Sequence, residues 1–89
     1  MGKAVEVRIT GTVQGVSFRA YAREQARELG VTGWIRNERE GSVAGHFEGP
    51  DAAVDALVDW CWDGPPSAQV IDVVVTDASP TAARTFVIR

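Results

Sequence analysis

Two stretches of the sequence place apolar residues at helical spacing, and stretches of alternating apolar and polar residues lie on either side of both. This order constrains the fold more than any other feature. The first helix is predicted from about Phe18 to Leu29, with Gly30 where a left-handed helix terminus favours glycine. The second is predicted after Asp51, a candidate N-cap. Its apolar stripe consists of Val54, Leu57, Val58 and Cys61.

Strands are predicted around these helices. Alternating residues run from Ala4 to Gly11, and an extended segment reaches from Val31 to about Arg36. A polar turn at 37–41 leads into a third strand from Ser42 to Glu48, which makes a hairpin with the second. A fourth strand covers 71–76, and a short last strand carries Phe86 and Ile88. The order β-α-β-β-α-β plus a short C-terminal strand predicts an α+β fold of the ferredoxin-like, split βαβ type. In this fold two helices lie on one face of an antiparallel sheet.

Composition narrows the range of functions. The 89 residues, with 45% hydrophobic and 24% charged, predict a single globular domain over 1–89. A net charge of -3 disfavours a sequence-independent nucleic-acid binder, and no apolar run approaches the roughly 20 residues of a membrane span. With a lone cysteine and no secretion-signal pattern, we expect a cytoplasmic monomer without nucleic-acid or membrane partners.

The segment from Val13 to Arg19 joins the first strand to the first helix and carries the strongest functional signal. The first N–H groups of a helix have no internal partner and carry partial positive charge, so this position suits an anion. Gly15 allows a tight turn, and Arg19 offers a fork of donors that matches two phosphate oxygens. A strand-to-helix turn with a glycine and one arginine also occurs as a purely structural feature, so this segment alone leaves both interpretations open.

A second segment decides between them. The loop V-Q-G-V-S-F-R at 13–19, with G-W-I-R-N at 33–37 and G-S-V at 41–43, resembles the two-part signature of acylphosphatases over essentially the whole chain. The resemblance implies hydrolysis of the carboxyl–phosphate anhydride of acyl phosphates, without metal or cofactor. It implies that Arg19 grips the phosphoryl group and that Asn37 orients the attacking water. It assigns phosphate binding to Gln14, Gly15, Val16, Ser17, Phe18 and Arg19.

The sequence departs from the family pattern at Ala44, where many relatives have a polar residue, and we expect this position to be peripheral. Two alternatives share the same motif. A non-catalytic anion-binding or regulatory module would tolerate loss of Asn37, so the presence of both Arg19 and Asn37 favours the enzyme. The acylphosphatase-like domain of hydrogenase-maturation carbamoyltransferases is disfavoured because no cysteine-rich zinc modules follow. The acyl half of the substrate stays open, as does an approach of the Arg89 carboxylate to Arg19.

Other candidate residues have structural explanations. His46 alternates out of phase with Val43 and Phe47, so we expect it on the opposite sheet face and without a catalytic role. Cys61 lies on the apolar stripe and is expected to be a packed small residue rather than a nucleophile.

The aromatic and acidic residues are also expected to be structural. Trp60 and Trp62 are predicted at the edge of the core, and Phe18 and Trp34 are expected to pack rather than to stack on bases. The carboxylates that recur every four positions predict a solvated helix face rather than a cation site. They are Asp51, Asp55, Asp59 and Asp63.

Overall fold

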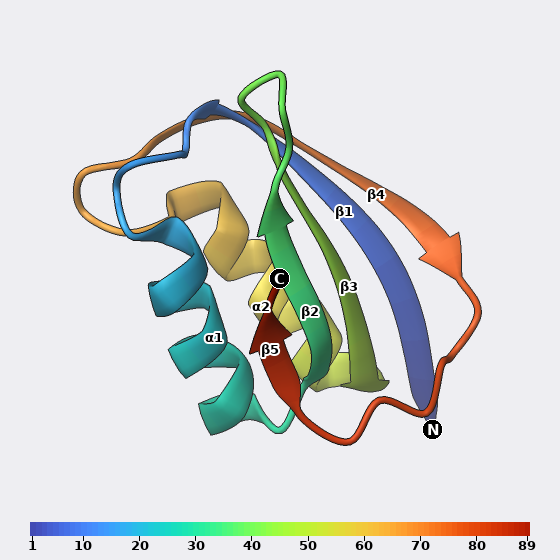
Figure 1. The fold of residues 1–89 in the computed structure, drawn as a ribbon. Coiled ribbons are helices and arrows are strands. Elements are labelled where there is room, and N and C mark those ends of the chain that lie inside the picture. Colours follow the sequence, from blue (N-terminus) through green and yellow to red (C-terminus); the bar gives the residue numbers. More distant parts are fainter.

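The computed structural model describes residues 1–89 and contains two helices and five strands (Figure 1). The strands form one sheet in the order β4-β1-β3-β2-β5. The elements are β1 (Gly2–Thr12), α1 (Phe18–Leu29), β2 (Thr32–Asn37), β3 (Val43–Pro50), α2 (Asp51–Asp63), β4 (Gln69–Ala78) and β5 (Phe86–Ile88). Both helices cover the same face of the sheet, which confirms the predicted fold (Figure 1).

Strand direction adds one feature to the prediction. The pairings among the first four strands, β1 with β3, β1 with β4 and β2 with β3, are antiparallel, as expected. β5 runs parallel to β2, so the five-stranded sheet is mixed. The chain leaves β4 at one edge, crosses the end of the sheet through residues 79–85 and enters β5 at the other edge (Figure 1). β5 therefore ends beside the end of β2, which matters for the site described below.

The core lies between the sheet and the helices. Period-2 alternation in β1 sends every second side chain toward the helices, while Ala22 and Ala26 of α1 are small enough for that helix to approach the sheet closely. Full burial of a large apolar side chain contributes about 1.5–3 kcal/mol. The largest fully buried side chains are Phe18, Phe47, Phe86, Ile9, Ile35 and Leu57.

The residues at two of the helix ends, Gly30 and Pro50, have backbone conformations typical of helix caps. α1 ends at Gly30, which has a left-handed conformation (φ 77°), as predicted. α2 differs from the prediction: Asp51 is the first helical residue, and Pro50 occupies the N-cap position in an extended conformation. The Asp51 carboxylate lies in the first turn of α2, where its negative charge interacts favourably with the helix dipole although it does not cap the helix. Neither helix combines the length and apolar character needed to cross a membrane.

The aromatic residues divide between the two faces. Phe18 packs in the core, with its ring centroid 5.3 Å from that of Trp60, so both expectations are confirmed. Trp62 is instead 49% exposed, because two residues along a helix turn its side chain to the far side. Trp34 lies on the open face of the sheet, opposite to the buried Ile35, and packs there against His46, with ring centroids 6.3 Å apart.

Candidate active site

A pocket of about 390 Å³ lies where the loop between β1 and α1 meets the ends of β2 and β5. Arg19 and Asn37, 18 positions apart in the sequence, both line it. The loop places the first turn of α1 at this edge, and β2 ends in Asn37 beside it. The complete lining is Val13, Gly15, Ser17, Phe18, Arg19, Ala20, Asn37 and Ile88.

The loop reaches α1 through two left-handed residues. Gly15 has φ 75°, and nothing lies within 4 Å of a Cβ built there, so the backbone conformation and not crowding favours glycine. Ser17, the N-cap of α1, has φ 63° and ψ 25° and makes no side-chain capping hydrogen bond. The helix N-terminus at the pocket is therefore uncapped, and its first N–H groups are available to an anion.

Arg19 has no hydrogen bond or ion pair with another side chain or the backbone. In contrast, Arg8 contacts Glu40 and Arg36 contacts Glu38, each with an N–O distance of 3.0 Å. A permanently charged guanidinium left unpaired in a pocket is suited to a bidentate anion such as phosphate. The suggested ion pair between the carboxylate of Arg89 and Arg19 is not formed within 4.0 Å.

Asn37, which lines the same pocket, carries an unsatisfied polar atom. Its Oδ1 is buried and has no hydrogen-bond partner, the only such side-chain atom in the protein. Buried side-chain oxygens in folded proteins are nearly always satisfied, so an exception calls for a missing donor.

The side chain of Gln14 contacts the turn between β2 and β3. Its Nε2 donates to the backbone carbonyl oxygens of Glu38 (2.7 Å) and Ser42 (2.9 Å), so the amide faces the β2–β3 turn. Neither Gln14 nor Val16 lines the pocket, and Val16 lies in a neighbouring hollow with Tyr21. The structure thus gathers five predicted residues in one pocket: Gly15, Ser17, Phe18, Arg19 and Asn37.

Comparison with known proteins identifies the family of this chain. The family model described as Acylphosphatase matches residues 5–88. The chain belongs to the acylphosphatase family. An acylphosphatase from Nocardioides sp. is 53% identical over 89 residues, which is all of this chain and 90% of that protein. One from Rhizobium meliloti is 52% identical over 81 residues, covering 91% of this chain and 85% of that protein. The structure of an acylphosphatase from Coxiella burnetii superposes with a TM-score of 0.96 at 34% identity, covering 99% of this chain and 93% of that one.

Sequence reasoning missed Ile88 in the site of this acylphosphatase-family chain. Ile88 was expected in a short strand, but only the parallel pairing of β5 with β2 brings it to the pocket. Arg89 secures that end of the chain, because its N–H donates to the carbonyl of Ile35 (2.9 Å) and its guanidinium lies 4.7 Å from the ring centroid of Trp34. No signal in the sequence alone reports the direction of such a short strand.

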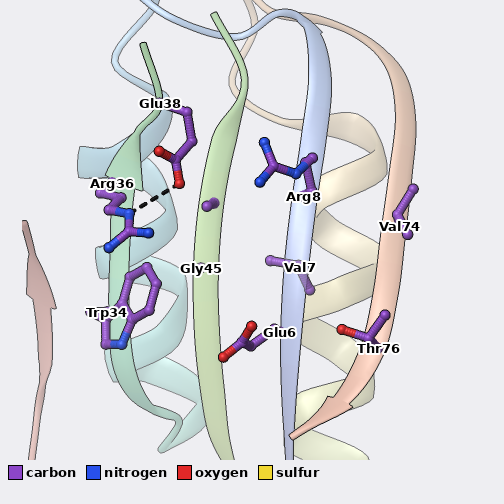
Figure 2. Close-up of a pocket in the computed structure, with 10 residues that line it drawn as sticks. Glu6, Val7, Arg8, Trp34, Arg36, Glu38, Gly45, Val74 and Thr76 are labelled. Carbon is purple, nitrogen blue, oxygen red and sulfur yellow. Dashed lines mark hydrogen bonds and ion pairs between the residues drawn. The ribbon is translucent and has the colours of Figure 1, made fainter. Parts of the chain in front are cut away.

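A second hollow, of about 310 Å³, lies on the open face of the sheet of the acylphosphatase-family fold (Figure 2). Figure 2 shows Trp34 and Arg36 on β2, with the ion pair between Arg36 and Glu38 above the Trp34 ring. The Arg36 guanidinium is 4.7 Å from that ring centroid. Ala44 lines this hollow and not the pocket with Arg19, so the departure from the family pattern lies outside the candidate site.

His46 lies on the open face, as predicted, and is buried in a polar cluster. Its Nε2 is 2.7 Å from Oε2 of Glu48, which also accepts hydrogen bonds from the N–H and hydroxyl of Thr81. Burial by itself raises the pKa of Glu48, but the bonds from Thr81 and His46 outweigh it and hold the pKa below its ordinary value of 4.5. This cluster ties the 79–85 connection to β3, away from the pocket.

Cys61 and the acidic residues of α2 have no part in the site. Cys61 is fully buried in the core, as predicted, and burial raises the pKa of its thiol to about 12. The four aspartates of α2 are exposed, which confirms the solvated face, and Asp55 pairs with Lys3 at 2.5 Å. No three His, Cys, Asp or Glu side chains gather as metal ligands.

Proposed function

We propose that this chain hydrolyses acyl phosphates to a carboxylate and inorganic phosphate. The observation that carries the proposal is the shared pocket of Arg19 and Asn37. The guanidinium of Arg19 is unpaired, the N-terminus of α1 beside it is uncapped, and the carboxamide oxygen of Asn37 is unsatisfied. Membership of the acylphosphatase family supports the same reaction.

The phosphoryl group is bound at the N-terminus of α1 in this proposal. The first backbone N–H groups of the helix and the forked donors of Arg19 neutralise its oxygens, with Gly15 and Ser17 shaping the turn around them. The same donors stabilise the charge on the equatorial oxygens as the bond to the carboxylate breaks. A carboxylate leaving group needs little protonation, so a general acid is not required.

Asn37 positions the nucleophile. Its free Oδ1 accepts a hydrogen bond from a water molecule and holds it against the bound phosphoryl group. Fixing the attacking molecule in line removes much of the entropic cost of the reaction. The proposal divides the roles: Arg19 acts mainly on phosphate binding and charge, while Asn37 acts mainly on turnover.

The first experiment follows hydrolysis of benzoyl phosphate in the presence of EDTA. We expect Arg19→Ala to reduce kcat/KM by about 10³ or more, since a preorganised donor and a full charge are both lost. Asn37→Ala should reduce kcat by about 10²–10³ with little change in the inhibition constant of inorganic phosphate.

Matched controls come from the same helix. Arg23→Ala removes an α1 guanidinium and Gln25→Ala a carboxamide, and neither residue lines the pocket. Both variants should retain wild-type rates, with folding of all variants confirmed by circular dichroism. A folded wild-type chain that binds phosphate through Arg19 but shows no turnover would instead establish a non-catalytic anion-binding module.

The proposal also covers assembly and location: a monomer acting in the cytoplasm on a small acyl phosphate, without nucleic acid. A net charge of -3 and a single, buried cysteine support this. Light scattering coupled to size exclusion should give a mass near 9.6 kDa at micromolar concentration. A dimer mass would contradict the monomer.

A further inference from the structure

We infer that Gln14 is a positioning residue that holds Asn37 in place against the phosphate-binding loop. The role rests on the proposed function, because it concerns the geometry of the attacking water. It is a role of the side chain beyond membership of the phosphate-binding loop, because the amide bonds to the β2–β3 turn and Gln14 does not line the pocket.

The contact joins two separate parts of the site. The groups proposed to bind phosphate belong to the loop and to the first turn of α1, whereas Asn37 ends β2. Between residues 13–17 and residues 37–42, the only hydrogen bonds are the two donated by Nε2 of Gln14. One is accepted by the carbonyl of Glu38, the residue that follows Asn37.

The acceptors are already part of a closed turn. The N–H of Glu38 donates to the carbonyl of Ser42 (2.8 Å), and the N–H of Gly41 donates to the carbonyl of Glu38 (3.1 Å). Gln14 adds a bond to each of these two carbonyl oxygens. Gln14 therefore bonds to both carbonyl oxygens that accept the backbone hydrogen bonds of the turn. Because Asn37 adjoins Glu38, the same bonds restrain the position of Asn37.

A separate contact holds the other side of the same turn. Nη1 of Arg8 donates to the Ser42 hydroxyl (2.9 Å) and to Glu40 (3.0 Å). Because Arg8 belongs to β1, this contact keeps the hairpin on the sheet without connecting it to the phosphate-binding loop. We therefore expect the turn to keep its shape when Gln14 is lost and its distance from the phosphate-binding loop to change.

A specific kinetic pattern follows. Without Gln14, the uncapped end of α1 and Arg19 still bind phosphate. Asn37, however, is no longer held at a fixed position relative to the bound phosphate. A displacement of about 1 Å is enough to cost up to 10² in rate. Turnover should fall while phosphate affinity is preserved.

The test compares Gln14→Ala, Asn37→Ala and the double variant with benzoyl phosphate as substrate and inorganic phosphate as inhibitor. We expect kcat of Gln14→Ala to fall about tenfold, with the phosphate inhibition constant within twofold of wild type. Because Gln14 acts through Asn37, the double variant should be no slower than Asn37→Ala alone. A merely structural effect would not produce this dependence.

Two further variants complete the design. Gln25→Ala, on α1 and outside the pocket lining, is the matched carboxamide deletion and should leave kcat unchanged. Gln14→Glu keeps the shape but offers no donor to the two carbonyls, and it serves as the second variant if Gln14→Ala fails to fold. It should lose kcat at least as strongly.

The outcomes separate the two claims. An inactive wild type overturns the proposed function, and the role of Gln14 with it. An active wild type in which folded Gln14→Ala retains its kcat within twofold overturns only the positioning role. So does a double variant whose kcat loss equals the product of the two single losses.

Discussion

The Oδ1 atom of Asn37 is buried without a hydrogen-bond partner, and Asn37 lines the same pocket as the unpaired guanidinium of Arg19. One group lacks a donor and the other lacks an acceptor, yet the two remain unpaired. An anion together with a hydroxylic donor would satisfy both groups. Phosphate with a bound water meets this requirement, and it leads to the first two predictions.

Arg19→Lys should separate charge from geometry. Lysine keeps the positive charge but replaces the planar fork with a point charge, so bidentate contact with two phosphate oxygens is lost. We expect kcat/KM to lie between those of wild type and Arg19→Ala, about 10–10²-fold below wild type. Steady-state kinetics on benzoyl phosphate measure it. A Lys variant as active as wild type would show that charge alone is sufficient.

Asn37→Asp should damage binding as well as turnover. The new carboxylate would lie in a pocket shaped for an anion, so it would repel phosphate and form an ion pair with Arg19 where distance allows. We expect a rise of at least tenfold in the phosphate inhibition constant, whereas Asn37→Ala leaves that constant nearly unchanged. Equal phosphate inhibition in the two variants would place Asn37 away from the bound anion.

Ser17→Gly should stabilise the fold. Ser17 is an exposed, non-glycine residue with φ 63° and no capping hydrogen bond, and the left-handed conformation costs such a residue about 1–2 kcal/mol. Glycine loses more backbone entropy on folding, so we expect a net gain of about 0.5–1 kcal/mol in the free energy of unfolding. Urea denaturation measures it. Ser67→Gly, an exposed serine outside the left-handed region, is the control and should show no gain.

The periodic spacing of apolar residues predicted most of the fold. The spacing from Phe18 to Leu29 gave the bounds of α1 because a single buried stripe with a glycine stop leaves little choice of register. The same alternation sends Ile35 to the core and Trp34 to the open face of the sheet.

Features that depend on pairing between distant segments could not be predicted from the sequence. The direction of β5, and with it the place of Ile88, is set by the path of residues 79–85 across the end of the sheet. The Gln14 amide bonds to the β2–β3 turn because two carbonyl oxygens of that turn lie beside it. A motif gives the identity of such a residue but not the acceptors that surround it.

Glu48→Gln should remove a pH-dependent part of the stability. Because Thr81 and His46 hold the pKa of Glu48 below 4.5 in the folded protein, its contribution is fully present above that pH. The contribution is lost as pH falls from about 4.5 through the lower folded-state value. We expect the variant to be about 2 kcal/mol less stable at pH 7, with the difference shrinking below pH 4.5. Urea denaturation between pH 3 and 7 measures it.

Exposed Glu24→Gln should show no such convergence, and a constant difference for Glu48→Gln would contradict the assignment.

Cys61 should be inert toward thiol reagents while the chain is folded. It is fully buried against Leu57 and Val54 in the core, and burial raises the pKa of its thiol to about 12, so almost no thiolate is present or accessible at pH 8. Reaction with a disulfide reagent then requires unfolding. Its rate should follow the opened population and rise with urea. Rapid labelling in native buffer, at a rate independent of urea, would show that α2 opens locally. Cys61→Ala, which cannot react, gives the background rate and should itself cost about 1 kcal/mol for the lost sulfur volume.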